Sequence, residues 1–229
     1  MAFGGKTRRK SYKCGGLIVN ENHLSTAVCP FCKKYISVSE PIYTHINAAY
    51  DSDALKRVIS GNANRVKCNL CGEMFYYEHN CGIYNYEKNY AICCICDGTP
   101  PPQYKTALFN ILKKQNMKLR QVNEFIHLIE KVRIFEFNLD DRVLENVKYK
   151  YIECTHNIQK NAKIILTNAE SNAMVFTVYD EYDRETARHR VNLDAYWKES
   201  IHLADETITG CVTQWRKVDM EWAKALHKS

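Results

Sequence analysis

The sequence predicts an α+β fold in which a small cysteine-rich module precedes a helical and antiparallel β-meander domain. Three observations predict it. Two Cys-x-x-Cys pairs lie 35 residues apart in the first part of the chain. Apolar residues then recur at helical spacing, and the last third consists of short apolar runs separated by turn residues.

The paired cysteines are Cys29-Pro30-Phe31-Cys32 and Cys68-Asn69-Leu70-Cys71. Two thiolates two residues apart on a tight turn can both reach a metal about 2.3 Å away, and two such knuckles form a tetrahedral four-sulfur site that suits zinc. Since four thiolates leave no position for water, we predict one structural Zn²⁺. Four free thiols or two disulfides are the alternative.

The turns after the knuckles differ in sequence. Gly72 follows the second pair, at a place that often needs a positive φ, whereas Lys33 occupies that place in the first pair. The spacer between the pairs exceeds the common spacing of about 15–20 residues. A helix over residues 54–59, capped by Asp51-Ser52-Asp53 and stopped by Gly61-Asn62, accounts for the excess.

Short strands surround both knuckles and complete a zinc-ribbon module with a helical insert. We predict them over residues 24–28, 35–38, 65–67 and 73–77, with a further tyrosine-rich strand over residues 84–92. Three consecutive prolines, residues 100–102, then mark a boundary. The predicted divisions are a basic tail over residues 1–23, the zinc-ribbon module over 24–99 and an α+β domain over 104–229.

Helical apolar spacing predicts helices over residues 104–112 and 122–136. Asn138 is predicted to cap a third helix, with Asp141 in place of the capping-box glutamate, and its apolar side extends to Tyr151. Strands over residues 162–166, 174–179 and 188–193 form the predicted meander. Helices over 194–203 and 220–226 follow.

The composition is that of a globular protein, with 45% hydrophobic and 25% charged residues and a net charge of +6. No apolar run approaches the roughly 18 residues of a membrane span, and the N-terminus is not a secretion signal. Eleven cysteines fit metal ligation in a reducing cytoplasm better than an oxidised scaffold. Five basic residues crowd the first thirteen: Lys6, Arg8, Arg9, Lys10 and Lys13.

Paired knuckles around a helical insert, followed by several motif runs, resemble the CpXC domain family. The runs are Leu119-Arg120-Gln121-Val122, Leu128-Ile129-Glu130-Lys131, Asn138-Leu139-Asp140-Asp141-Arg142-Val143 and, more weakly, Val218-Asp219-Met220-Glu221-Trp222-Ala223. The resemblance covers roughly residues 24–226. It implies a prokaryotic origin and ligand roles for Cys29, Cys32, Cys68 and Cys71. Asn69 stands where the family has proline, and the family is functionally uncharacterised.

A second cysteine cluster, Cys93-Cys94-Ile95-Cys96, has two interpretations. With Cys81, Cys14 or His79 it could form a second metal site. Because adjacent residues of a strand point to opposite faces, Cys93 and Cys94 cannot easily bind one ion. Packing of cysteine as a small hydrophobe is the favoured alternative. His45 and His79 are expected to be packing or surface histidines.

The sequence contains no catalytic motif, and we predict a zinc-binding, non-enzymatic binding or adaptor protein whose protein partner it does not specify. One alternative is nucleic-acid binding through the basic tail and a face of tyrosines: Tyr76, Tyr77, Tyr84, Tyr86 and Tyr90. A weaker alternative is a metal-dependent hydrolase that uses the carboxylates of a predicted hairpin turn: Asp180, Glu181, Asp183 and Glu185. Neither alternative involves a membrane.

Overall fold

The computed structural model describes residues 25–98, 117–155, 162–205 and 215–228, and its fold is mixed α+β, as predicted. The strands are β1 (Ser25–Val28), β2 (Tyr35–Val38), β3 (His45–Asn47), β4 (Arg65–Lys67), β5 (Met74–Tyr76), β6 (Cys81–Asn85), β7 (Tyr90–Cys94), β8 (Lys118–Val122), β9 (Lys163–Ala169), β10 (Ala173–Tyr179) and β11 (Glu185–Asn192). The helices are α1 (Ser52–Ile59), α4 (Phe125–Glu136), α5 (Asp141–Cys154), α6 (Leu193–Asp205) and α7 (Met220–Leu226). The basic tail, the predicted helix over residues 104–112 and the predicted boundary at the prolines lie outside the described residues.

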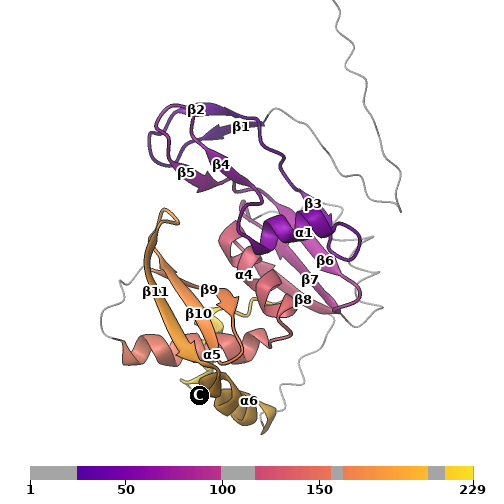
Figure 1. Cartoon of the computed structure of the whole chain (residues 1–229), viewed down its shortest axis with the longest axis vertical. Helices are drawn as coiled ribbons and strands as arrows, with labels where there is room; N and C mark the ends of the chain where they lie inside the picture. The colour runs from indigo at the N-terminus through magenta and orange to yellow at the C-terminus, as the bar shows by residue number, and fades with distance from the viewer. Residues whose placement is uncertain (1–24, 99–116, 156–161, 206–214, 229) are drawn as a thin grey trace, which may run out of the picture.

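Two antiparallel hairpins carry the cysteine pairs. Strand β1 pairs with β2 around the first pair, and β4 pairs with β5 around the second. We call residues 25–38 and 65–77 the four-cysteine module, and the remaining described residues the core body. The module lies at one end of the molecule (Figure 1) and has its own small core, in which Ile36, Val66 and Phe75 pack beside Cys29 and Cys68.

The insert between the two hairpins packs into the core body. Strand β3 pairs in parallel with β6, and Ala54 and Val58 of α1 are buried in the core around α4. The predicted cap is confirmed, because the Asp51 side chain accepts a hydrogen bond from the Ala54 N–H at 2.9 Å.

The side chain of Asn64 joins the two ends of this insert. Its Oδ1 accepts from the Tyr43 N–H at 2.8 Å, and its Nδ2 donates to the Tyr43 carbonyl at 3.2 Å. Asn64 has a φ of 52°, a conformation that asparagine tolerates better than most residues. Its carbonyl accepts from the Tyr77 N–H at 2.8 Å, so one buried residue links the insert to the strand leaving the module.

The central sheet has the order β3-β6-β7-β8. The single strand predicted over residues 84–92 is wrong: β6 and β7 form a hairpin whose turn lies inside that range. The Asn85 side chain accepts from the N–H groups of Glu87 and Lys88, and Asn89 adopts a φ of 54°, so asparagines shape the turn.

The helix predicted from residue 122 begins at Phe125. The residues just before it form β8, which pairs in parallel with β7. Pairing with a neighbouring strand overrides the local apolar spacing there. Beyond β8, the backbone of Arg216 exchanges hydrogen bonds with Leu119 and Gln121, which continues the sheet with the C-terminal segment.

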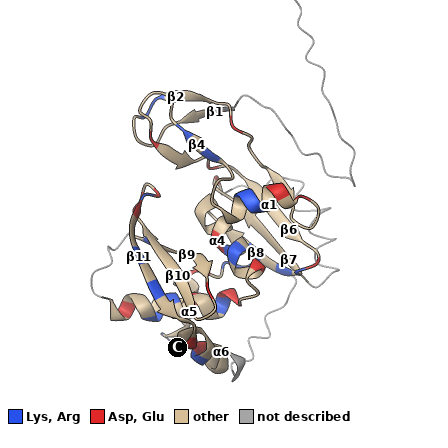
Figure 2. Ribbon diagram, viewed as in Figure 1, with Lys and Arg blue, Asp and Glu red and all other residues tan. Residues whose placement is uncertain are grey.

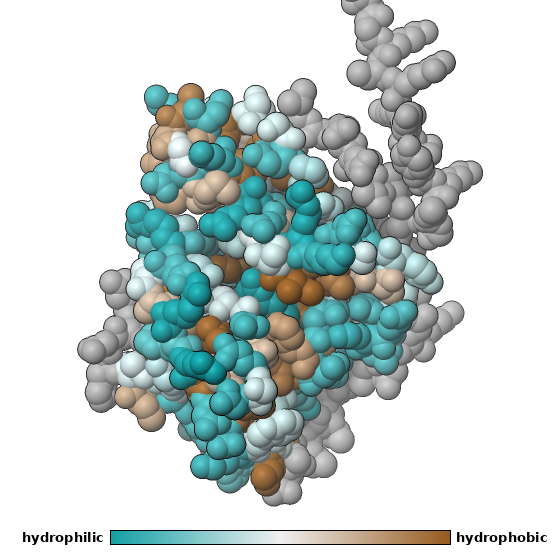
Figure 3. Space-filling model, in the orientation of Figure 1, coloured by the Kyte–Doolittle hydropathy of each residue, from teal (hydrophilic) through white to brown (hydrophobic). Residues whose placement is uncertain are grey.

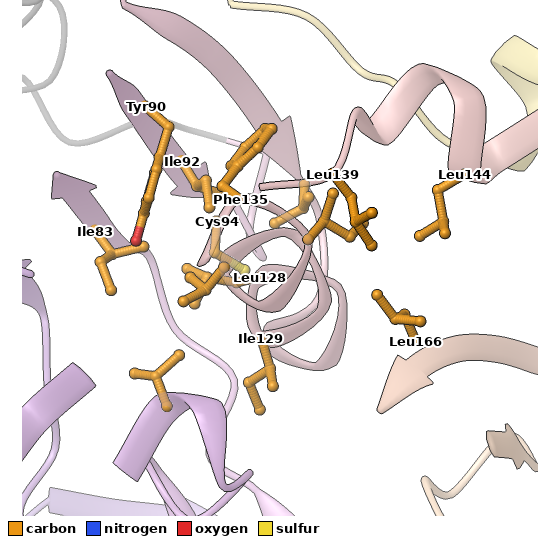
Figure 4. Close-up of a cluster of buried hydrophobic side chains, with 14 of the residues drawn as sticks. Ile83, Tyr90, Ile92, Cys94, Leu128, Ile129, Phe135, Leu139, Leu144 and Leu166 are labelled. Atoms are coloured by element: carbon orange, nitrogen blue, oxygen red, sulfur yellow. The ribbon is translucent and has the colours of Figure 1, made fainter. Parts of the chain in front are cut away.

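Helix α4 lies between the central sheet and the antiparallel meander β9-β10-β11 (Figure 1). Ten of its twelve residues are buried. In Figure 4, Leu128 and Phe135 lie beside Ile92 and Cys94 of the sheet, while Leu144 and Leu166 line the side of α5 and the meander. A helix buried all round in this way is the centre of the core body.

Helix α5 is capped by Asp140, whose side chain accepts from the Arg142 N–H, and the predicted cap at Asn138 is therefore wrong. Asn138 instead has a φ of 57° just after α4, the left-handed conformation that ends helices. Helices α6 and α7 pack on α5. None of the helices in the described ranges combines the length and apolar character that a membrane span requires.

Candidate metal centre

The structure brings the four predicted cysteines together. Their Sγ atoms all lie within 4.8 Å of one another, with Cys29 and Cys71 3.6 Å apart and Cys32 and Cys68 3.8 Å apart. Two sulfurs bound to one zinc at about 2.3 Å, at the tetrahedral angle, would be separated by about 3.8 Å. The cluster therefore has the dimensions of a four-thiolate metal site.

The two knuckles have the same backbone geometry despite their different sequences. The N–H of Lys33 donates to the Cys29 carbonyl and that of Gly72 to the Cys68 carbonyl, each at 2.9 Å. Lys33 has a φ of 59° and Gly72 a φ of 81°. Both hairpins therefore contain a residue in the left-handed conformation. In the first hairpin this residue is a lysine, for which that conformation is less favourable than for glycine.

Backbone N–H groups surround the sulfur of Cys68. Those of Leu70 and Cys71 lie 3.4 and 3.5 Å from Cys68 Sγ. Burial by itself would raise the pKa of this thiol, but hydrogen bonds from Cys71 and Leu70 lower it to about 6. A hydrogen bond from the Glu73 backbone would lower the pKa of Cys71, but burial and hydrogen bonds with Cys68 and the other two cysteines raise it to about 12. In the absence of a metal the knuckle therefore favours the thiolate at Cys68 only.

The cluster is closed by its own hairpins. Cys29 and Cys68 are buried in the small core of the module, Cys32 is partly exposed and Cys71 is exposed at its edge. Four soft ligands fill a tetrahedral shell, so the arrangement can fasten β1–β2 to β4–β5 but offers no open position for a substrate.

His45 and His79, which the sequence predicts to be packing or surface histidines, do not belong to this cluster. The ring nitrogens Nδ1 and Nε2 of His79 each lie 3.1 Å from a backbone carbonyl oxygen, of Tyr77 and Tyr43 respectively. His45 lies on β3, where its Nδ1 is 3.4 Å from Thr44 Oγ1. Among the described residues, the group that can hold a metal at the knuckles consists of the four cysteines alone.

The tyrosines do not gather on one open face. Tyr90 and Tyr84 are buried in different clusters of the core body, and the Tyr76 hydroxyl donates to the Gly61 carbonyl at 3.2 Å. These three side chains support the sheet and its contact with α4. The basic residues of the nucleic-acid alternative, at positions 6–13, lie outside the described residues.

The acidic hairpin tip between β10 and β11, red in Figure 2, is occupied by separate local contacts. Asp180 accepts from the N–H groups of Tyr182 and Arg184, which shapes the turn. Asp183 pairs with Lys163 at 2.8 Å, and Glu185 with Arg188 at 2.8 Å. In the described part of the chain these carboxylates form no metal-ligand group.

A buried ion network lies where α4, α5 and β8 meet, and sequence reasoning missed it. Its members alternate in charge along a chain of ion pairs: Arg120, Asp141, Lys131, Glu145, Lys148 and Glu130. Each side chain is at most 10% exposed. Glu130 also accepts from the Leu166 N–H of β9 at 2.7 Å, which fixes the meander to the network.

Opposite charges hold these groups ionised despite burial. Burial would raise the pKa of Glu130, but Lys148 and other cationic neighbours lower it to about 2. The pKa of Asp141 is lowered against burial by Lys131 and Arg120, and that of Lys131 is raised against burial by Glu145 and Asp141. One feature of the sequence could have indicated the network: four of its members lie in the runs that resemble the CpXC family, namely Arg120, Glu130, Lys131 and Asp141.

Comparison with known proteins gives one match. The family model described as CpXC protein matches residues 27–148, which is more than half of the chain. No curated protein matches, and no solved structure matches. The matched stretch contains the four cysteines and every member of the ion network, but it ends before the run Val218–Ala223. The chain therefore belongs to the CpXC protein family.

Proposed function

We propose that this protein is a zinc-binding, non-enzymatic binding or adaptor protein whose four-cysteine module is held together by one structural Zn²⁺. The observation that carries the proposal is the set of four Sγ atoms at tetrahedral spacing on two equivalent knuckles. Zinc is the metal that best fits four thiolates without redox chemistry, and a reducing cytoplasm keeps such thiols available.

The dependence of the module on its metal follows from the size of its core. Seven residues of the described part are fully buried there, and two of them are the ligands Cys29 and Cys68. So small a core cannot offset the entropy of ordering two hairpins, so metal binding must supply part of the folding free energy. Two hairpins joined through one metal constitute the proposed zinc ribbon.

A binding role is supported by the surface of the module. Its strands and knuckles expose four large apolar side chains: Val28, Tyr35, Leu70 and Met74. Figure 3 shows hydrophobic residues among hydrophilic ones at this end of the molecule, and further hydrophobic residues over the middle of the same face. Exposed apolar side chains grouped on one small unit are typical of a protein-binding surface.

The metal assignment is tested by elemental analysis and by cobalt substitution. Co²⁺ bound by four thiolates in tetrahedral geometry gives strong visible and charge-transfer absorption, and Cys68→Ser should weaken both this absorption and zinc retention. Cys154→Ser, which changes an exposed cysteine outside the cluster, is the matched control. Full zinc retention by the Cys68→Ser protein would overturn the four-ligand site.

The binding role is tested by affinity capture with surface variants. Proteins captured by the wild-type chain should be lost with the double substitution Tyr35→Ser and Leu70→Ser. They should be retained with Tyr50→Ser, which changes a tyrosine that is 86% exposed but lies in the core body. Equal capture by all three proteins would remove the module surface from the proposal.

A further inference from the structure

A second group of metal-ligand side chains lies in the core body, apart from the knuckles. The Sγ atoms of Cys94 and Cys96 are 3.4 Å apart, and Cys96 Sγ lies 3.0 Å from Glu78 Oε2. One ligand atom from each of the three residues lies within 4.8 Å of the other two. Cys94 is the last residue of β7 and Cys96 follows two residues later, so their side chains lie on the same side of the chain.

The three neighbouring cysteines differ in their surroundings. Cys94 is buried in the core around α4. Cys93 points to the opposite face, where it packs with Ile95 beside Trp215 in an apolar cluster. Cys96 is partly exposed, and its sulfur lies against a carboxylate and, at 3.3 Å, the His79 carbonyl oxygen. A cysteine that served only as a small hydrophobe would have the surroundings of Cys93.

Surrounding hydrogen bonds hold the three groups in place. The Glu78 carboxylate accepts from the Phe125 N–H at the start of α4, at 2.9 Å through Oε2 and 3.2 Å through Oε1. The backbone N–H of Cys96 donates to Asn80 Oδ1 at 2.9 Å, and Asn80 Nδ2 donates to Asp97 at 2.7 Å. Fixed ligands with oriented partners are what a metal site requires.

One side of the group opens into a cavity of about 580 Å³. Glu78 and Cys96 line it, together with Glu124, Lys163, Tyr182 and Asp183. The cavity lies between the four-cysteine module, the start of α4 and the β10–β11 turn, and its volume is in the range of small-molecule sites. A metal bound to the three groups would therefore have one position directed at solvent.

We propose that Cys94, Cys96 and Glu78 form a second Zn²⁺ site with an open coordination position toward this cavity. Two thiolates and a carboxylate suit zinc, and three protein ligands plus water are the arrangement of exchangeable or catalytic zinc rather than structural zinc. Zinc binding displaces the two thiol protons to solvent. Cys81, opposite Cys94 in the β6–β7 pairing and as buried as Cys94, does not belong to the group of ligand atoms that lie within 4.8 Å of one another.

Zinc content of the full chain and its variants, measured by mass spectrometry of the elements, tests the site. Cys96→Ser should lower zinc by one ion per chain relative to wild type, while Cys93→Ser, the neighbouring cysteine on the other face, should not. Glu78→Gln keeps an acceptor for the Phe125 N–H and should weaken retention of the same ion. Cys68→Ser should remove only the zinc of the four-cysteine site. Failure of that proposal and failure of the second-site proposal are therefore distinguishable.

Cobalt titration tests the open position. Azide should change the visible spectrum of the Co²⁺ that Cys96→Ser removes and leave the four-thiolate spectrum unaltered. Equal zinc in wild type, Cys96→Ser and Glu78→Gln would overturn the site. So would a Cys94–Cys96 disulfide found by peptide mass spectrometry in protein that holds no second ion. An azide-insensitive spectrum would overturn the open position.

Discussion

The four-cysteine module and the core body both bury charged groups, but they balance the charge differently. The module collects four cysteine sulfurs, which in the proposed zinc form bind as thiolates, so the charge of the cluster has one sign and the balancing cation must come from solution. The core body balances three carboxylates with three cations of its own chain in the network around α4 and α5. If the module binds the proposed metal, its folding should depend on that ligand, whereas folding of the core body should not.

The size of the two cores strengthens this contrast. Among the described residues, the core around α4 contains twenty-eight buried residues, against seven in the module. Hydrophobic burial can therefore support the core body even though its ion network contributes little net stability.

The largest effect is expected from metal removal, since zinc binding supplies about 10–16 kcal/mol in zinc-finger peptides. With a chelator at neutral pH, amide hydrogen exchange should become fast in β1, β2, β4 and β5. Exchange should stay slow in α1 and α4, because α1 packs in the core body although it lies between the knuckles. Loss of protection in α1 together with β1 would show that the insert belongs energetically to the module.

The next effect is expected from Lys148→Met, which leaves Glu130 and Glu145 facing each other without their shared cation. Breaking a buried pair costs about 3–5 kcal/mol. Denaturant unfolding of the zinc-loaded protein should show this loss. Lys150→Met, on the same helix, removes a lysine that is 47% exposed and pairs with Glu199, and should cost less than Lys148→Met. Equal losses would mean that burial of the network has no energetic consequence.

The two regions should lose their structure at different pH values when acid is added. The pKa of Glu130 is lowered in the folded state to about 2, so its stabilising contribution is complete above its ordinary carboxyl pKa and is lost as the pH falls toward 2. Protons compete with zinc for the thiolates at higher pH. Zinc release should thus precede the loss of helical circular dichroism as pH decreases. Simultaneous transitions would contradict the independence of the two regions.

The smallest effect is expected from Gly72→Ala. At a φ of 81° a side chain costs about 1 kcal/mol, and no atom lies within 4 Å of the added Cβ, so backbone strain is the whole effect. Zinc affinity of the knuckle site should fall about fivefold in a competition titration. Gly98→Ala, at a φ of 76° and also in open space, lies outside the module and should leave this affinity unchanged.

The parts of this molecule that the sequence predicted are those determined by local chemistry. The cysteine knuckles, the Asp51 cap and helix α7 need only residues close in the chain. Strands β3 and β8 were missed because each is short and exists through parallel pairing with a distant strand. The ion network was missed because charged residues on a helix ordinarily face solvent, and only packing of α5 on α4 brings Lys148 to Glu130.

The side-chain bonds between Asn64 and Tyr43 also have a consequence in polymer terms. These bonds join the two ends of the insert. The loop between Cys32 and Cys68, which contains 35 residues along the chain, then has an effective length of fifteen: eleven residues up to Tyr43 and four from Asn64. Loop-closure entropy then falls by about 0.7 kcal/mol. Although the insertion lengthens the chain between the two knuckles, the proposed metal therefore has a ring of ordinary length to close.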